Sequence, residues 1–169
     1  MNCGFFIIGE EFGSFDFLES IHIGGGTCLD LRRYLHGHCD IFSTYLNLKF
    51  NYKIAAIFRK GHDNRHYLIH AFNAYYQGGL RNYIDIRGYS SDINDILDSE
   101  FELRPFEEIV NGFAYGVDYD FDYYMEFNTF HELHQYLNDI GAYSGIQRCI
   151  KHFELFEELL RVFSNYYRL

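Results

Sequence analysis

Apolar residues recur with helical spacing after Cys39. They follow an i, i+1, i+4, i+5 pattern that lines one face of a helix, at Ile41, Phe42, Tyr45, Leu46 and Phe50. Gly37 interrupts the chain before this segment, and the polar residues 51–53 close it. The pattern predicts a helix that runs from Cys39 to about residue 50.

Three β-compatible runs follow this helix. Residues 54–58 are short and apolar, and residues 67–76 and 82–87 contain many aromatic and β-branched side chains. A Gln-Gly-Gly segment separates the second run from the third, and such a segment is typical of a tight turn. We therefore expect a central strand followed by an antiparallel hairpin.

Two capping-box patterns predict further helices, because a Thr side chain can accept a hydrogen bond from the backbone three residues later. The first pattern, Thr27–Asp30, predicts a short helix over about 28–35. The second pattern, Thr129–Glu132, predicts a helix to about Ile140 that Gly141 stops.

Weaker patterns assign most of the remaining chain. Residues 91–97 are expected to form a short helix, residues 146–167 a long amphipathic helix, and residues 101–103 an edge strand. Residues 113–124 are so rich in Tyr, Phe and Asp that their periodicity predicts no structure. Residues 1–26 mix short apolar runs with glycine and are expected to form a flexible lead-in.

The composition is that of one folded domain. Of the 169 residues, 48% are hydrophobic and 20% are aromatic, with 18 Phe, 16 Tyr and no Trp. Folding at this length buries roughly 70% of the surface of the unfolded chain, so one sizeable core is expected. The sequence contains no linker or repeat. We predict a single α+β domain over residues 1–169, with a core at 27–100 and a mainly helical extension at 101–169.

The charge and the amino-terminal sequence narrow the possible partners. The formal net charge is −10, and this sign argues against nucleic acid as a partner because its phosphates are also negative. The first residues lack the basic region of a secretory signal, and no run approaches the roughly 18 apolar residues that span a bilayer. We expect a soluble cytoplasmic protein with no membrane contact and no cofactor. The sequence does not indicate an oligomeric state.

One cysteine is placed for chemistry. The four cysteines are far apart and include no CxxC pair, so free thiols are expected at Cys3, Cys28, Cys39 and Cys149. Cys39 falls in the first turn of the predicted helix, where unpaired backbone N–H groups and the helix dipole stabilise a thiolate. Its own N–H group would also face the oxyanion that forms during acyl transfer.

A histidine and an aspartate accompany this cysteine on the predicted hairpin. His70 lies on its first strand and Asp85 on its second, and the midpoint between them falls at residues 77 and 78, close to the turn. Residues on neighbouring strands can meet when their side chains point to the same side of the sheet. His70 could then take the thiol proton, and Asp85 could orient the imidazole.

The residues around these positions form a motif in three segments: Gly37-His38-Cys39-Asp40-Ile41-Phe42, His70-Ala71-Phe72, and Tyr83-Ile84-Asp85-Ile86-Arg87-Gly88. The motif resembles the papain-like cysteine hydrolase superfamily, and especially its transglutaminase-like branch, over about residues 27–100. In that branch a Cys opens a helix, a His followed by a small and an aromatic residue begins a strand, and an Asp about fifteen residues later lies on the next strand. The resemblance implies a helix packed on a small antiparallel sheet.

The resemblance also implies an activity. The chain would be a cysteine-dependent amidohydrolase or acyltransferase, such as a protease, a deamidase or a transglutaminase-like enzyme, acting on a protein or peptide. Cys39 would form an acyl-enzyme, His70 would act as general base and acid, and Asp85 would orient His70.

Three further residues are candidates for substrate or oxyanion contacts. No Gln precedes Cys39 to donate to an oxyanion, so that role falls to backbone N–H groups or to Tyr34. His38 precedes the nucleophile, and Phe72 takes the place of the Trp that is usual in the transglutaminase-like branch. The acidic stretch 115–124 is expected to wall the cleft and to favour a basic substrate segment through Asp118, Asp120 and Asp122.

Other interpretations of the same residues stay open. A zinc site could use potential ligands among His36, His38, Cys39, His62 and His66, although zinc prefers four closely spaced ligands. Cys28 also precedes a predicted helix and is a competing nucleophile, but no His and Asp pattern accompanies it. Singly, a buried Cys, a strand His and an Asp before a turn are common structural features.

A different class of function is also compatible with the sequence. The chain could be a non-catalytic acidic binding or inhibitor protein that keeps the fold, encoded by a phage or another mobile element. Its acidic surface would then meet a basic protein or mimic nucleic acid. Richness in Tyr, Phe, Asn and Ile is the only feature that points toward a small AT-rich genome.

Overall fold

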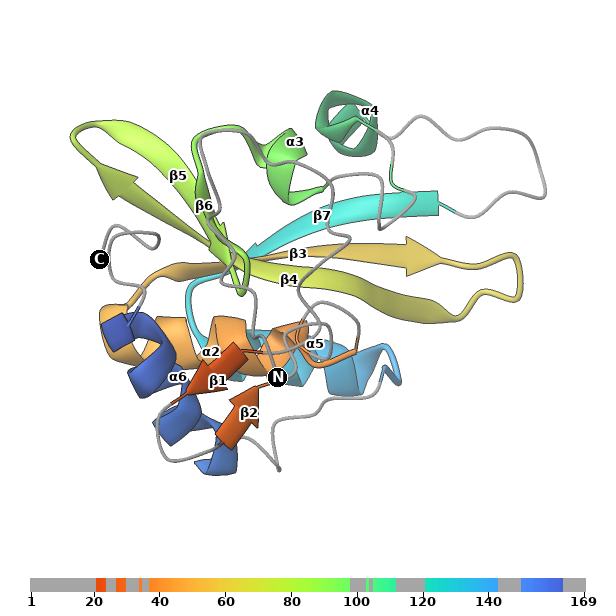
Figure 1. Cartoon of the computed structure of the whole chain (residues 1–169). Coiled ribbons are helices and arrows are strands. Elements are labelled where there is room, and N and C mark those ends of the chain that lie inside the picture. The colour runs from red at the N-terminus through yellow and green to blue at the C-terminus, as the bar shows by residue number, and fades with distance from the viewer. Residues whose placement is uncertain are drawn as a thin grey trace.

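A five-stranded antiparallel sheet lies between two layers of helices (Figure 1). The computed structural model describes residues 21–23, 27–29, 34, 37–97, 103, 105–111, 121–142 and 150–162. This architecture confirms the α+β class that the sequence predicts.

The sheet contains most of the strands in the described part of the chain. Its strands are β3 (Lys53–Lys60), β4 (His66–Gln77), β5 (Leu80–Asp85), β6 (Gly88–Ser90) and β7 (Phe121–Phe127). Their order across the sheet is β6-β5-β4-β3-β7, so β4 lies in the middle. A separate short pair joins β1 (Ile21–Ile23) and β2 (Thr27–Leu29).

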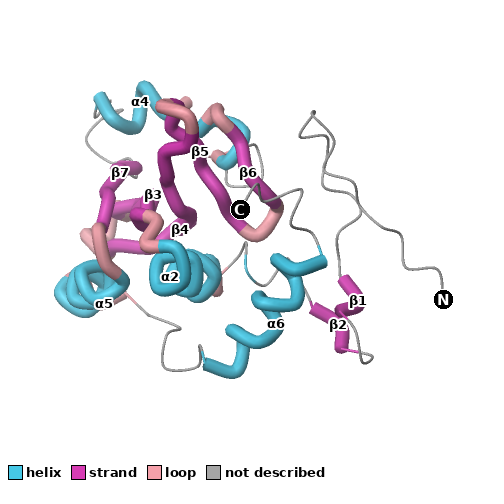
Figure 2. Tube along the Cα trace, turned by 90° about the vertical axis from the view of Figure 1, so that its left-hand side faces the viewer, coloured by secondary structure: helices cyan, strands magenta, loops and turns pink. Residues whose placement is uncertain are grey.

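The helices cover both faces of the sheet. They are α2 (Cys39–Phe50), α3 (Ile93–Ile96), α4 (Phe106–Asn111), α5 (Phe130–Asp139) and α6 (Ile150–Val162). Helices α2 and α5 lie on one face and α3 and α4 on the other, as the turned view also shows (Figure 2). In the described ranges, no helix combines the length and the apolar character that crossing a bilayer requires.

Alternation along the central strands produces two separate cores. Ala56 and Ala71 belong to the core under α2 and α5, whereas Ile57 and Phe72 belong to the core under α3 and α4. Successive residues of a strand point to opposite faces, so neighbours in sequence are separated by the sheet. The small Ala side chains on the α2 side let this helix lie close to β4.

The β4–β5 hairpin sets the register of the sheet near the motif residues. Gly78 and Gly79 both have positive φ, at 62° and 82°, which L side chains rarely adopt and which suits a two-residue hairpin turn. The turn pairs Gln77 with Leu80. The turn is therefore centred between residues 78 and 79, one residue later than the midpoint between His70 and Asp85.

Helix α2 is the central helix of the fold and is anchored by polar contacts. All residues from 39 to 47 are buried, and Asn51 ends the helix in the left-handed conformation. Asn47 donates to the carbonyl oxygens of Tyr52 and Asn128 and accepts from the N–H group of Phe130. One side chain thus ties α2 to β3 and to the start of α5.

An Asn47→Ala variant is expected to lose about 2–3 kcal/mol of unfolding free energy, because it removes the partners of buried backbone groups. Urea unfolding monitored by circular dichroism measures this loss. A Leu48→Ala control changes the next residue, which is 52% exposed, and should shift stability by no more than about 0.5 kcal/mol. Equal losses in the two variants would contradict the anchoring role.

Several sequence predictions are confirmed by the structure. Helix α2 starts and ends where its apolar spacing indicates, and the strands expected at 54–58 and 67–76 correspond to β3 and β4. The strand expected at 82–87 corresponds to β5, which ends at Asp85 because residues 86–87 form a turn. The short helix after residue 91 is α3, whose N-cap Asp92 accepts from the N–H group of Asn94. Both halves of the second capping box are present at the start of α5.

Other predictions need correction or lie outside the described residues. Residues 27–29 form strand β2 rather than the start of a helix, because they pair with β1, and β1 itself falls in the expected lead-in. Helix α6 occupies the middle of the expected helix over 146–167, while 143–149 and 163–169 lie outside the described residues. In the expected edge strand, Leu103 is not in a strand, and 101–102 lie outside the described residues.

Candidate active site

Cys39 is the first residue of helix α2 and is 3% exposed. Gly37 precedes it with a φ of 95°, a left-handed conformation that favours glycine, and redirects the chain into the helix. His38 occupies the N-cap position, and its Nδ1 atom lies 2.6 Å from the carbonyl oxygen of Gly37. The backbone N–H groups of the first helical turn therefore gather around Cys39.

The environment of the Cys39 thiol keeps it protonated. Burial, together with the carboxylate of Asp40, raises the pKa of Cys39 to about 12. Backbone N–H groups lower the pKa of this thiol, but their effect is smaller than that of burial. They belong to Ala71, Asp40 and Cys39 itself. The expectation of a stabilised thiolate at the helix start is therefore wrong, because desolvation exceeds the effect of the helix terminus.

His70 and Asp85 form a buried hydrogen-bonded pair. The Nε2 atom of His70 lies 3.0 Å from Oδ2 of Asp85, and the two residues are 0% and 1% exposed. The register pairs Asn73 with Ile84, so Asp85 is diagonal to His70 rather than opposite it. Diagonal neighbours on one face remain within reach of a long side chain.

A third charged residue belongs to this pair. Arg87 donates from Nε and Nη2 to Oδ2 of Asp85, at 2.9 and 2.7 Å, and from its backbone N–H group to Oδ1 at 2.8 Å. Burial alone would raise the pKa of Asp85, but the charge of Arg87 and the hydrogen bond from His70 lower it to about 2. An ionised carboxylate only accepts hydrogen bonds, so Nε2 of His70 is the nitrogen that carries the proton.

The sheet separates the sulfur from the imidazole. His70 pairs with Ile57 and stacks on Phe72, which places its ring on the α3 side of β4. Cys39 packs in the core on the α2 side, where its sulfur lies near the N–H group of Ala71, the residue after His70. The structure thus brings His70 to Asp85, and it brings Cys39 to the backbone next to His70.

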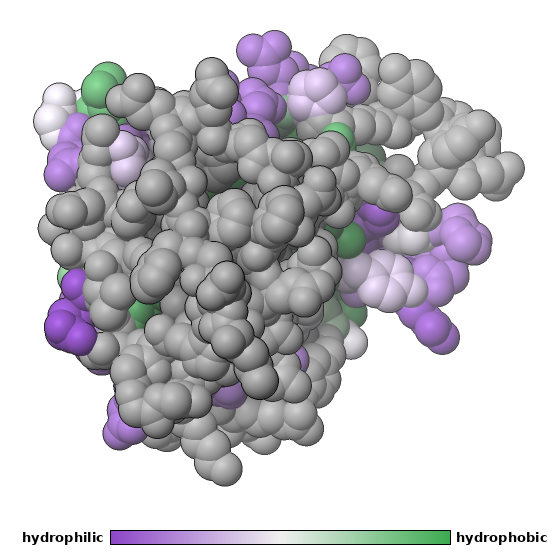
Figure 3. Space-filling view, viewed as in Figure 1, coloured by the Kyte–Doolittle hydropathy of each residue, from purple (hydrophilic) through white to green (hydrophobic). Residues whose placement is uncertain are grey.

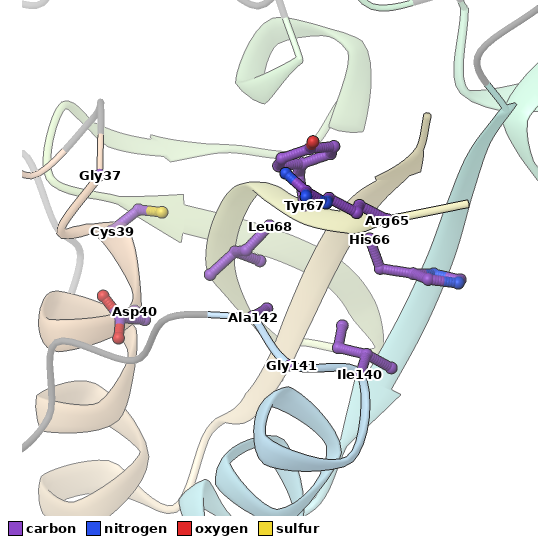
Figure 4. Close-up of a pocket in the computed structure, with 10 residues that line it drawn as sticks. All are labelled: Gly37, Cys39, Asp40, Arg65, His66, Tyr67, Leu68, Ile140, Gly141 and Ala142. Atoms are coloured by element: carbon purple, nitrogen blue, oxygen red, sulfur yellow. The ribbon is translucent and has the colours of Figure 1, made fainter. Parts of the chain in front are cut away.

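Cys39 and Asp40 also line a pocket of about 680 Å³. Gly37 lies beside them, and the other walls are residues 65–68, at the beginning of β4, and residues 140–142, which follow α5. Figure 4 shows the Cys39 side chain pointing from the start of α2 toward the β4 side of this pocket. Apolar groups of Leu68 and of residues 140–142 make one part of its lining aliphatic.

Tyr34 and Phe72 lie in cores rather than in the pocket wall. The hydroxyl of Tyr34 is hydrogen-bonded to Nδ1 of His152 on α6, and its ring packs against Phe156. Phe72 is fully buried and contacts the His70 ring with a centroid distance of 5.7 Å. Neither residue is placed for the oxyanion or substrate contact expected of it, whereas the partly buried His38 stays beside Cys39.

The competing chemistries find little support in the described part of the chain. No group of three or more His, Cys, Asp or Glu residues there is placed to hold a metal ion. His66 is instead hydrogen-bonded through Nδ1 to the hydroxyl of Tyr123 at 2.7 Å. Cys3 and Cys149 and the side chain of Cys28 lie outside the described residues, as does His36.

The acidic stretch before β7 is placed only in part. Asp118 and Asp120 lie outside the described residues, and Asp122 is held by Arg59 through hydrogen bonds of 2.7 and 3.0 Å. Arg59 therefore already neutralises the Asp122 carboxylate, which does not line the pocket beside Cys39. Hydrophilic residues gather on the side of the molecule where the β3–β4 loop lies (Figure 3).

Comparison with known protein families, curated proteins and solved structures finds no match to this chain. The site is therefore defined by its own geometry. Sequence reasoning missed Arg87 and Asp40, which act directly on Asp85 and on the thiol. Arg87 reaches Asp85 through the turn that residues 86–87 form between β5 and β6.

Proposed function

We propose that the chain is a cysteine-dependent amidohydrolase or acyltransferase with a papain-like, transglutaminase-like core. The observation that supports this best is the buried hydrogen bond between His70 and Asp85, formed next to the residue whose N–H group meets the Cys39 sulfur. Cys39, His70 and Asp85 would be the nucleophile, the base and the orienting residue. A cytoplasmic location, which suits a free thiol, is part of the proposal.

The protonation states define the mechanism. Because the thiol is protonated at neutral pH, it cannot attack as a preformed thiolate. Because the sheet separates the sulfur from the imidazole in this structure, the proposal requires the Cys39 or His70 side chain to move until Nδ1 of His70 reaches the sulfur. Nδ1 then takes the thiol proton as the S–C bond to the substrate carbonyl forms. The imidazolium then returns this proton to the leaving group, and water or an amine releases the acyl group from Cys39.

The pocket favours a protein or peptide as the substrate. Its volume of about 680 Å³ lies in the range of ligand sites and is large enough for a side chain with its flanking backbone. The aliphatic part of the wall would hold apolar atoms, and the carboxylate of Asp40 would favour a basic group close to the nucleophile. Asp40 thereby takes the role in substrate selection that the sequence suggested for the acidic stretch.

Acyl trapping tests the proposal. Incubation with p-nitrophenyl acetate should acetylate Cys39, and a His70→Gln variant should slow this reaction by about 10²-fold or more because it lacks the general base. Peptide mass mapping with a time course measures both results. A His62→Gln variant is the matched control, since His62 lies in the exposed β3–β4 loop. Acetylation at another cysteine, or an equal rate in the His70 variant, would contradict the assignment.

A second candidate is the non-catalytic acidic binding protein. Burial of all three residues favours it, because a thiol that is 3% exposed beside a fully buried His-Asp pair can also be a purely structural arrangement. In this case the net charge of −10 would serve recognition of a basic partner.

A further inference from the structure

Arg87 is a fully buried cation whose hydrogen bonds converge on one carboxylate. Its guanidinium donates to Oδ2 of Asp85 from two nitrogens, and Nη2 also donates to the carbonyl oxygen of Ile96 at 2.5 Å. The same Oδ2 atom accepts from His70. Asp85 is thus shared between the imidazole and the guanidinium, and Arg87 links both to the end of α3.

Sharing one carboxylate has a consequence for the charge of His70. Arg87 already balances the single negative charge of Asp85 in a buried site. A protonated His70 would add a second positive charge to the same oxygen atom, in surroundings where charge is poorly solvated. The arrangement therefore disfavours the imidazolium form in the resting protein.

We propose that Arg87 is a positioning residue that keeps Asp85 ionised and keeps His70 neutral, with its proton on Nε2. This inference rests on the proposed function, because it gives His70 the protonation state that attack by a neutral thiol requires. Arg87 touches neither substrate nor sulfur in this scheme, and it acts through Asp85.

The surroundings of the pair agree with this role. Strand β3 contributes the apolar Ile57, β4 contributes Phe72, and α3 contributes the carbonyl oxygen of Ile96. On the α2 side, Asp40 and the protonated Cys39 are separated from the pair by the backbone of β4. The charged groups that contact the Asp85 carboxylate in the described part of the chain are His70 and Arg87.

Nitrogen-15 NMR of the histidine rings tests the proposal directly. In the unaltered protein at pH 7, His70 should be neutral and protonated on Nε2. An Arg87→Gln variant should raise the proton affinity of His70 at least about tenfold, because the carboxylate then has only the imidazole as a cationic partner. An Arg87→Lys variant keeps the charge and should bring the proton affinity of His70 back toward the value in the unaltered protein. A merely structural role would leave the His70 titration unchanged in all three proteins.

Two results would overturn the proposal. One is an imidazolium, or a proton on Nδ1, at pH 7 in the unaltered protein, a measurement that needs no variant to fold. The other is an unchanged His70 titration in folded Arg87→Gln protein. Neither readout depends on activity, so failure of acyl trapping with the expected NMR result would reject the enzyme while leaving the role of Arg87 intact.

Discussion

A Cys39→Ala variant is expected to lose essentially all biological and acyl-transfer activity while its fold stays intact. The sulfur is the atom that would bond to the substrate carbonyl, and removal of a nucleophile typically lowers turnover by about 10⁴-fold or more. The replacement only removes one buried sulfur atom from the start of α2. Activity assays of the purified variant, with circular dichroism as the check on folding, measure both parts.

A Ser43→Ala variant is the matched control for this experiment. Ser43 is buried on the same helix, and its hydroxyl donates to helix carbonyl oxygens, so its loss removes one buried atom without touching the proposed chemistry. It should keep its activity. Full activity in the Cys39 variant would reject catalysis and would instead support the non-catalytic binding protein.

Short sequence patterns correctly predict the helices and turns whose formation depends mainly on residues close together in the chain. The helix after Cys39 follows from apolar periodicity, and the hairpin follows from two glycines that accept positive φ. Strand β7 could not be predicted in this way. Its aromatic and acidic side chains do not alternate cleanly, and it is a strand because it pairs with β3 from Ile54 to Lys60.

Long-range pairing also explains the wrong helix at residues 28–35. The Thr27–Asp30 spacing is a local capping signal, but the pairing of 27–29 with 21–23 supplies backbone hydrogen bonds of another kind. Such tertiary contacts routinely override local propensity. The second capping box succeeds because α5 is also amphipathic, with Leu133 and Leu137 buried.

The sequence predicts the contact between His70 and Asp85, but it does not predict that the sheet separates this pair from Cys39 or how strongly burial changes the thiol. Chain order and element type correctly indicate that His70 meets Asp85, although the turn is centred one residue later than expected. The state of the thiol depends on how completely Cys39 is buried, and burial is a property of the whole fold. The partner that neutralises Asp85 also depends on the folded chain, because Arg87 reaches this carboxylate through the turn at residues 86–87.

Acidification is expected to remove a defined part of the stability. The pKa of Asp85 is lowered from 3.8 to about 2 in the folded protein by Arg87 and His70, against the opposing effect of burial. A carboxyl group with a depressed folded pKa stabilises the fold above its unfolded pKa, and this contribution disappears as the pH falls through the folded value. Asp85 should thus contribute about 2 kcal/mol above pH 4 that is lost between about pH 4 and pH 2.

An Asp85→Asn variant isolates this contribution, because its amide does not titrate. At pH 7 it should unfold with about 3–5 kcal/mol less free energy than the unaltered protein, since Arg87 then keeps a buried charge without its counter-ion. Below pH 4 the difference in unfolding free energy between the two proteins should shrink by about 2 kcal/mol, because protonation of Asp85 removes that contribution from the unaltered protein. Urea unfolding at a series of pH values measures both, with Asp139→Asn at the exposed end of α5 as the matched control. A difference that stays constant from neutral pH to pH 2 would show that Asp85 does not hold its charge through Arg87 and His70.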